Sequence, residues 1–122
     1  MKRKIDEMNL FFEEKMLECE KRKAQLLEDD RADEADFEKI RANIYDVFRT
    51  VLSAAHKACG EDEEAVKSFF MTKTEQIPAS WRVSLEKAQV HGDERKMCVE
   101  KIKLAAAEEI REKFKYVWEG KK

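Results

Sequence analysis

The chain has 122 residues and a mass of 14.4 kDa, the size of one ordinary domain with its own core. Charged residues make up 43% and hydrophobic residues another 43%, and the periodic spacing of the hydrophobic residues disfavours intrinsic disorder. The formal net charge is only -2, so no bulk charge draws the chain to nucleic acid or anionic lipid. We expect residues 1–122 to form a single helical-bundle domain.

Membrane insertion and disulfide bonding are both disfavoured. No segment approaches the roughly 20 apolar residues that a membrane span requires, and the basic residues 2–4 are followed by acids rather than by an apolar run. The three cysteines, Cys19, Cys59 and Cys98, are odd in number and widely spaced, so we expect reduced thiols. The expected location is the cytoplasm, without membrane contact.

Helix-breaking residues are few and divide the chain into segments. Gly60, Gly92 and Gly120 are the only glycines and Pro78 is the only proline; glycine ends helices readily, and proline lacks the N–H that continues one. We predict an all-α, up-and-down bundle of about four to five helices. Three are long, near residues 4–28, 33–59 and 93–119, and two short helices kinked at Pro78 together form the fourth leg.

The first long helix is predicted over residues 4–28. Its apolar residues recur at three- and four-residue steps: Ile5, Met8, Phe12, Met16, Cys19 and Leu26. The acidic run at residues 28–34 contains several good helix-capping types, so we expect a turn there and then the start of the next helix. The run lacks the central glycine of an EF-hand loop, which disfavours calcium binding.

The helix over residues 33–59 carries the most regular apolar pattern. Its steps of three and four residues form a heptad seam made of Phe37, Ile40, Ile44, Val47, Val51, Ala54 and Ala58. Further apolar residues lie beside this seam: Tyr45, Phe48, Leu52, Ala55 and Cys59. An apolar surface of that width needs more than one neighbouring helix to cover it, so we expect this helix at the centre of the domain.

The acids at residues 61–64 indicate another helix start. We expect Pro78 to break this helix and a second short one to follow over residues 79–91, with Ser80 as its candidate cap. Gly92 should end that helix and Asp93 should cap the last one. The last helix presents an apolar face made of Val99, Ile102, Ala106, Ile110, Phe114 and Val117.

Catalytic and metal-binding patterns are missing from the sequence. His56 and Cys59 have a spacing that suits one metal ion, but zinc needs two further ligands and no Cys-x-x-Cys pair supplies them. Neither histidine follows a glutamate by three residues, which excludes the di-iron pattern of ferritin-like bundles. We therefore predict no enzyme activity, no catalytic residues, no metal and no cofactor.

Adjacent large apolar residues are the remaining signal. Phe11 stands beside Phe12, Phe69 beside Phe70, and residues 116–118 are Tyr-Val-Trp. Adjacent helix positions diverge by about 100°, so one member of each group either leaves the core or is covered by the two short helices. The candidate partner surface consists of Phe11, Phe70, Trp81, Tyr116 and Trp118.

These observations favour a non-catalytic, cytoplasmic protein-protein interaction or assembly module, whose partner is another protein or a second copy. One alternative is a nucleic-acid-associated regulatory factor that uses the basic triplets at residues 2–4 and 21–23 and the lysines of the last helix; their acidic neighbours disfavour it. Another is a ligand- or metal-binding bundle, in which the alanines at 105–107 open a cavity near Cys59, His56 or Trp81.

Overall fold

The computed structural model of this protein describes residues 1–120 and contains four helices in that range, packed as a bundle. Helix α1 spans Lys2–Glu28, α2 spans Ala32–Cys59, α3 spans Glu63–His91 and α4 spans Glu94–Glu119. No strand occurs among the described residues. The predicted all-α bundle is confirmed, and its three long helices lie close to the predicted ranges.

The prediction for the fourth leg was wrong, because α3 runs through Pro78 without a break. Proline removes one backbone hydrogen bond, to the carbonyl of Thr74. The Pro78 ring is fully buried, and α3 packs along α4, so tertiary contacts offset that loss. The Thr74 hydroxyl donates to the Met71 carbonyl at 2.6 Å. Ser80 therefore lies within the helix and caps nothing.

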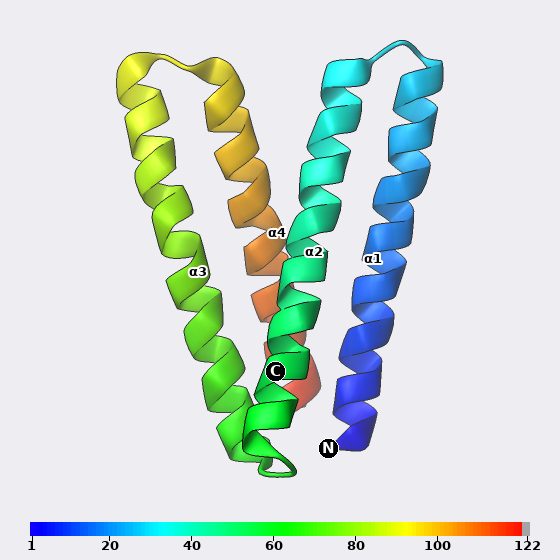
Figure 1. Cartoon of the computed structure of the whole chain (residues 1–122), viewed down its shortest axis with the longest axis vertical. Helices are drawn as coiled ribbons and strands as arrows, with labels where there is room; N and C mark the ends of the chain where they lie inside the picture. Colours follow the sequence, from blue (N-terminus) through cyan, green and yellow to red (C-terminus); the bar gives the residue numbers. More distant parts are fainter. Residues whose placement is uncertain (121–122) are drawn as a thin grey trace.

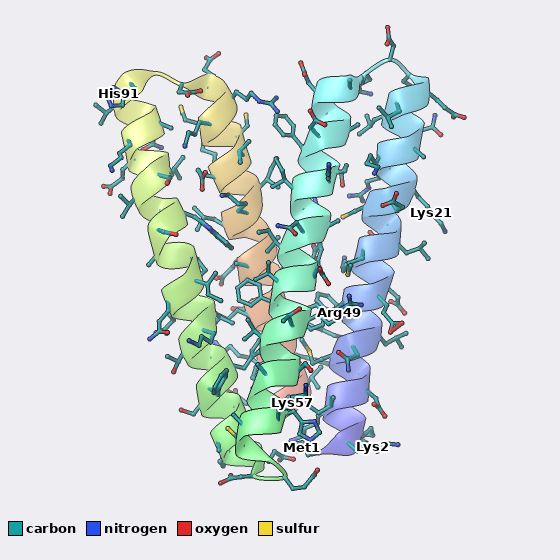
Figure 2. The ribbon with its side chains drawn as sticks, viewed as in Figure 1. Met1, Lys2, Lys21, Arg49, Lys57 and His91 are labelled. Carbon is teal, nitrogen blue, oxygen red and sulfur yellow. The ribbon has the colours of Figure 1, made fainter. Side chains whose placement is uncertain are left out.

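The four helices form two antiparallel hairpins, α1–α2 and α3–α4 (Figure 1). The hairpins converge at the end that holds the α2–α3 turn, which we call the closed end, and spread apart at the end that holds the turns at residues 29–31 and 92–93, the open end. Figure 2 marks the two ends by Met1 and Lys2 at the closed end and His91 at the open end. Helix α2 contacts all three other helices, as the width of its apolar face predicted.

The α3–α4 turn has the predicted residues in the predicted roles. Gly92 adopts a left-handed conformation, with φ 68° and ψ 27°, that glycine reaches at little cost. The Asp93 carboxylate accepts a hydrogen bond from the Lys96 backbone N–H at 3.1 Å and so caps α4. Asp62 caps α3 in the same way, through the Ala65 backbone N–H.

The hydrophobic core lies mainly in the closed half of the bundle. Its largest fully buried side chains are Phe12, Phe48, Phe70, Phe114, Met8, Leu52, Ile110 and Val66. The Phe70 and Phe114 rings stack with centroids 4.2 Å apart, and the Phe114 and Trp118 rings stack at 4.5 Å. Phe48 meets Phe70 edge-on at 6.2 Å. This aromatic stack joins α2, α3 and α4.

The buried face of α2 differs from the predicted seam. Of the seven seam residues only Ile44 is buried, whereas Ala54 and Ala58 are exposed. The buried positions are Ile44, four of the five residues predicted beside the seam (Tyr45, Phe48, Leu52 and Ala55) and Ala35, whereas Cys59 is partly exposed. Because α1 and α4 approach α2 from two sides, the residues between those two contacts are the ones that lose all access to water.

Candidate functional site: the open-end cleft

Among the incompletely covered apolar side chains near the open end, five line two adjoining hollows. They are Leu26 of α1, Phe37 and Ile40 of α2, and Val99 and Ile102 of α4, all of them partly exposed. Within residues 1–120 they lie outside the hydrophobic core cluster and its packed neighbours. We call the surface they line the open-end cleft. The sequence predicted all five on core-facing stripes, but the hairpins diverge before these residues can be buried together.

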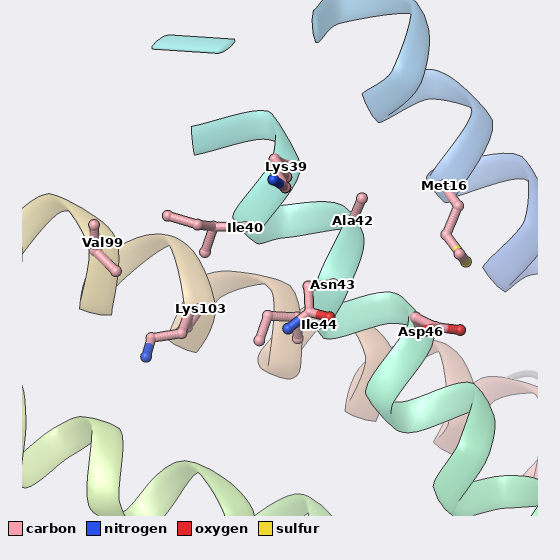
Figure 3. A pocket seen from close by; sticks show the side chains of 9 residues that line it. All are labelled: Met16, Lys39, Ile40, Ala42, Asn43, Ile44, Asp46, Val99 and Lys103. Atoms are coloured by element: carbon pink, nitrogen blue, oxygen red, sulfur yellow. The ribbon is translucent and has the colours of Figure 1, made fainter. Parts of the chain in front are cut away.

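One hollow of this cleft follows α2 and has a volume of about 500 Å³. Its lining residues come from three helices: Met16, Lys39, Ile40, Ala42, Asn43, Ile44, Asp46, Val99 and Lys103. Figure 3 shows Ile40 of α2 directed toward Val99 of α4, with Lys103 one turn further along α4. Buried Ile44 closes the hollow toward the core.

A second hollow of about 460 Å³ involves the remaining cleft residues. Leu26, Phe37 and Ile102 supply its apolar lining, and its polar lining includes acidic Asp29, Glu34 and Glu38 beside basic Arg22, Arg31 and Arg41. Apolar surface and charged rim therefore lie next to each other at the open end, the pattern of surfaces that bind partner proteins.

Arg95 bridges the two hairpin tips through two exposed contacts. The Arg95 guanidinium of α4 lies 5.3 Å from the centre of the Phe37 ring, and its Nη2 lies 3.8 Å from Asp36 Oδ2. The Arg95 and Asp36 side chains are 54% and 61% exposed. Contacts of this kind at exposed sites contribute about 1 kcal/mol or less, so little free energy opposes entry of a partner.

The tip of the α1–α2 hairpin is strongly acidic. Residues 28–38 contain seven acids and one base, Arg31. Within residues 1–120, four of those acids form no ion pair: Glu28, Asp29, Asp30 and Asp33. The α1–α2 tip therefore carries excess negative charge beside a cleft whose own lining holds both signs, and of the four acids Asp29 lines the second hollow. This charge attracts cations and repels anions over about a Debye length.

A polar cluster lies between α1, α2 and α4, below the cleft. The Tyr45 hydroxyl donates a hydrogen bond to the Glu109 carboxylate, which Lys15 Nζ approaches at 3.2 Å. Burial, followed by this bond, raises the pKa of Tyr45. Burial also raises the pKa of the Cys19 thiol to about 11. Cys19 therefore stays a neutral thiol near pH 7, unsuited to nucleophilic attack.

The residues of the predicted partner surface do not share one face. Phe70 is fully buried and Trp118 is 6% exposed; both belong to the core, which corrects their expected place on a partner surface. Phe11 is half-buried and meets the Tyr45 ring at 6.1 Å. Trp81 is partly exposed beneath Lys103 Nζ, which lies 5.3 Å from its ring centre. Tyr116 is the exposed member of the set.

The two candidate metal ligands, His56 and Cys59, each contact a different part of the protein. His56 Nε2 lies 3.4 Å from Glu61 Oε1, and Cys59 packs against the core. Within residues 1–120, no group of three or more His, Cys, Asp or Glu side chains is placed to hold a metal ion. None of the helices in that range has the length and apolarity needed to cross a bilayer.

No family model, curated protein or solved structure matches the chain significantly.

Proposed function

We propose that this protein is a non-catalytic interaction module whose open-end cleft binds a basic amphipathic helix of a partner protein. The observation that carries the proposal is the set of five partly exposed apolar side chains, Leu26, Phe37, Ile40, Val99 and Ile102, outside the core. A partner helix with one apolar face would remove that surface from water, as helices do in hydrophobic grooves.

The chemistry of the cleft argues for a helix with basic flanks. Each side chain that goes from half-buried to fully buried contributes about 1 kcal/mol, half the value for complete burial. Five such residues can offset a substantial part of the cost of association. The four acids without ion partners at the α1–α2 tip favour Lys and Arg on the partner and accelerate its approach at low ionic strength.

The proposal can be tested with two synthetic helices of about 18 residues that share a Leu-rich face and differ only in Lys or Glu on the flanks. We expect the Lys-flanked peptide to bind in calorimetry, the Glu-flanked one to bind at least tenfold more weakly, and the difference to shrink in high salt. NMR shifts of the protein should be largest at Ile40, Val99 and Ile102.

A matched pair of variants distinguishes binding in the cleft from nonspecific hydrophobic binding elsewhere on the protein. Ile40→Asp places a charge in the cleft and should weaken binding of the Lys-flanked peptide at least tenfold. Leu17→Asp alters an apolar residue that is 56% exposed on α1 and should leave binding unchanged. Failure of the Lys-flanked peptide to bind, or equal loss in the two variants, would contradict the proposal.

A further inference from the structure

Helix α3 carries a second apolar pattern on the side opposite its core face. Its buried residues are Val66, Phe70, Thr74, Pro78 and Ala88. On the other side, alternating steps of four and three residues connect Ala65, Phe69, Thr72, Gln76, Ala79, Val83, Glu86 and Val90, which we call the outer seam. This spacing is the heptad repeat of helices that pack along their length.

The outer seam faces solvent and is nearly free of charge. Val90 is 82% exposed and Val83 is 49% exposed, among the most exposed large hydrophobic residues of the described chain. Ala65 and Phe69 are partly exposed, and the other seam residues are exposed. Glu86 is the single charged residue among the eight, although 43% of the whole chain is charged. Phe69 also packs against the hydrophobic core, so the free part of the seam runs from Thr72 to Val90.

The order of residues along the seam fits a second copy in antiparallel orientation. When two seams align over their full length, Ala65 lies opposite Val90 of the second copy, Phe69 opposite Glu86, Thr72 opposite Val83 and Gln76 opposite Ala79. The seam is about 37 Å long at 1.5 Å per residue. A second straight helix of the same length would cover it from end to end. Parallel pairing would instead set Glu86 against Glu86, and like charges face to face are repulsive.

The charges that flank the seam support the same orientation. Glu75 and Arg82 lie on one flank of α3, since helix positions seven residues apart share a side. In the antiparallel pair that flank faces itself, and Arg82 comes within about 3 Å, measured along the axis, of Glu75 in the second copy. Within residues 1–120 Arg82 has no ion partner, whereas Glu75 Oε1 lies 3.2 Å from Arg111, leaving its second oxygen for another cation.

We propose that two copies of this protein associate through the outer seams of their α3 helices in antiparallel orientation, forming two Glu75–Arg82 ion pairs across the interface. From Thr72 to Val90 the seam residues are exposed, and none of the eight lines either hollow of the open-end cleft. The proposal therefore stands or falls independently of the proposed helix binding. Dimerisation would give each assembly two clefts and hence avidity for a partner with repeated helices.

Light scattering and sedimentation of the purified protein up to several hundred micromolar provide the first test. We expect a concentration-dependent rise from 14.4 kDa to twice that mass. Val83→Lys should abolish the rise, while Leu17→Lys, a substitution at a comparably exposed leucine of α1, should leave it intact. A mass of one chain at every concentration, or a dimer that survives Val83→Lys, would overturn the proposal.

Two further measurements test the orientation and do not depend on Val83→Lys folding. Arg82→Glu should raise the dimer dissociation constant at least fivefold, because it places like charges across the interface. With Cys59→Ser and Cys98→Ser in place, an oxidised mixture of Ala65→Cys and Val90→Cys chains should yield the mixed covalent dimer. An unchanged constant for Arg82→Glu, or a dominant Val90→Cys homodimer, would refute the antiparallel pairing.

Discussion

The uneven distribution of the core predicts that two phenylalanines differ sharply in their contribution to stability. Phe70 is fully buried and stacks on Phe114 at 4.2 Å, with Phe48 edge-on at 6.2 Å. Replacing a buried Phe by Ala costs about 3–5 kcal/mol, from lost transfer free energy and the cavity that remains. A chain of this size has a free energy of unfolding of roughly 5–15 kcal/mol, so Phe70→Ala should remove about a fifth of it or more.

Phe37 provides the matched comparison, since it is also a phenylalanine within a helix, in the second turn of α2, but lies in the open-end cleft. Its ring is partly exposed and lies outside the core cluster. Its specific contact is with Arg95, at 5.3 Å, which contributes about 0.5–1 kcal/mol at an exposed site. Phe37→Ala should therefore cost about 1 kcal/mol, roughly 3 kcal/mol less than Phe70→Ala.

Urea unfolding followed by circular dichroism at 222 nm measures both values. Phe70→Ala should lower the midpoint strongly and Phe37→Ala slightly, with the slope of free energy against urea unchanged in both variants. Equal losses for the two variants would show that the hairpins close over Phe37 in solution. In that case the open-end cleft does not exist and the reasoning built on it is refuted.

Three further predictions concern single contacts. Pro78→Ala should raise the free energy of unfolding by about 1 kcal/mol in chemical denaturation, because a helix-interior gain of about 3 kcal/mol exceeds the lost contacts of the buried ring and the greater freedom of the unfolded chain. The hydrogen bond from Lys4 holds the pKa of Glu63 below its ordinary 4.5, so this pair stabilises the fold above that pH and loses its effect as pH falls; Glu63→Gln should shrink the drop in Tm between pH 6 and pH 3. A maleimide should modify exposed Cys98 rapidly but reach buried Cys19 only on unfolding.

Local rules in the sequence predicted most of the secondary structure. Gly92 and Asp93 end α3 and begin α4 as expected, because the left-handed φ and the capping carboxylate depend on neighbours within a few residues. The predicted break at Pro78 was wrong because the deciding interactions are not local. Its cost is local, but the contacts that offset it come from a helix more than twenty residues away in the chain.

The candidate site depends on information that periodicity does not contain. The spacing of an apolar residue in a helix does not show whether a neighbouring helix covers it. The sequence therefore predicted the same burial for Phe37 and Val99 as for Phe48 and Phe114. The one local hint was the acidic run beside Phe37, which indicates a charged tip but not a divergence of hairpins. Of the predicted partner residues, Phe70 and Trp118 were misplaced because the sequence indicates that one member of an adjacent apolar group leaves the core but not which one. Phe70 is buried and Phe69 partly exposed, and Trp118 is buried while Tyr116 is exposed.

The sequence by itself determined that the protein is helical, where three of its helices lie and which residues end them, because helix formation and capping are set by interactions within about four residues. Only the tertiary structure decided which apolar side chains are buried, that α3 passes through Pro78, and that the hairpins separate at one end. Those outcomes depend on how helices distant in the chain share a limited contact area, and a side chain loses its access to water only where a second helix reaches it.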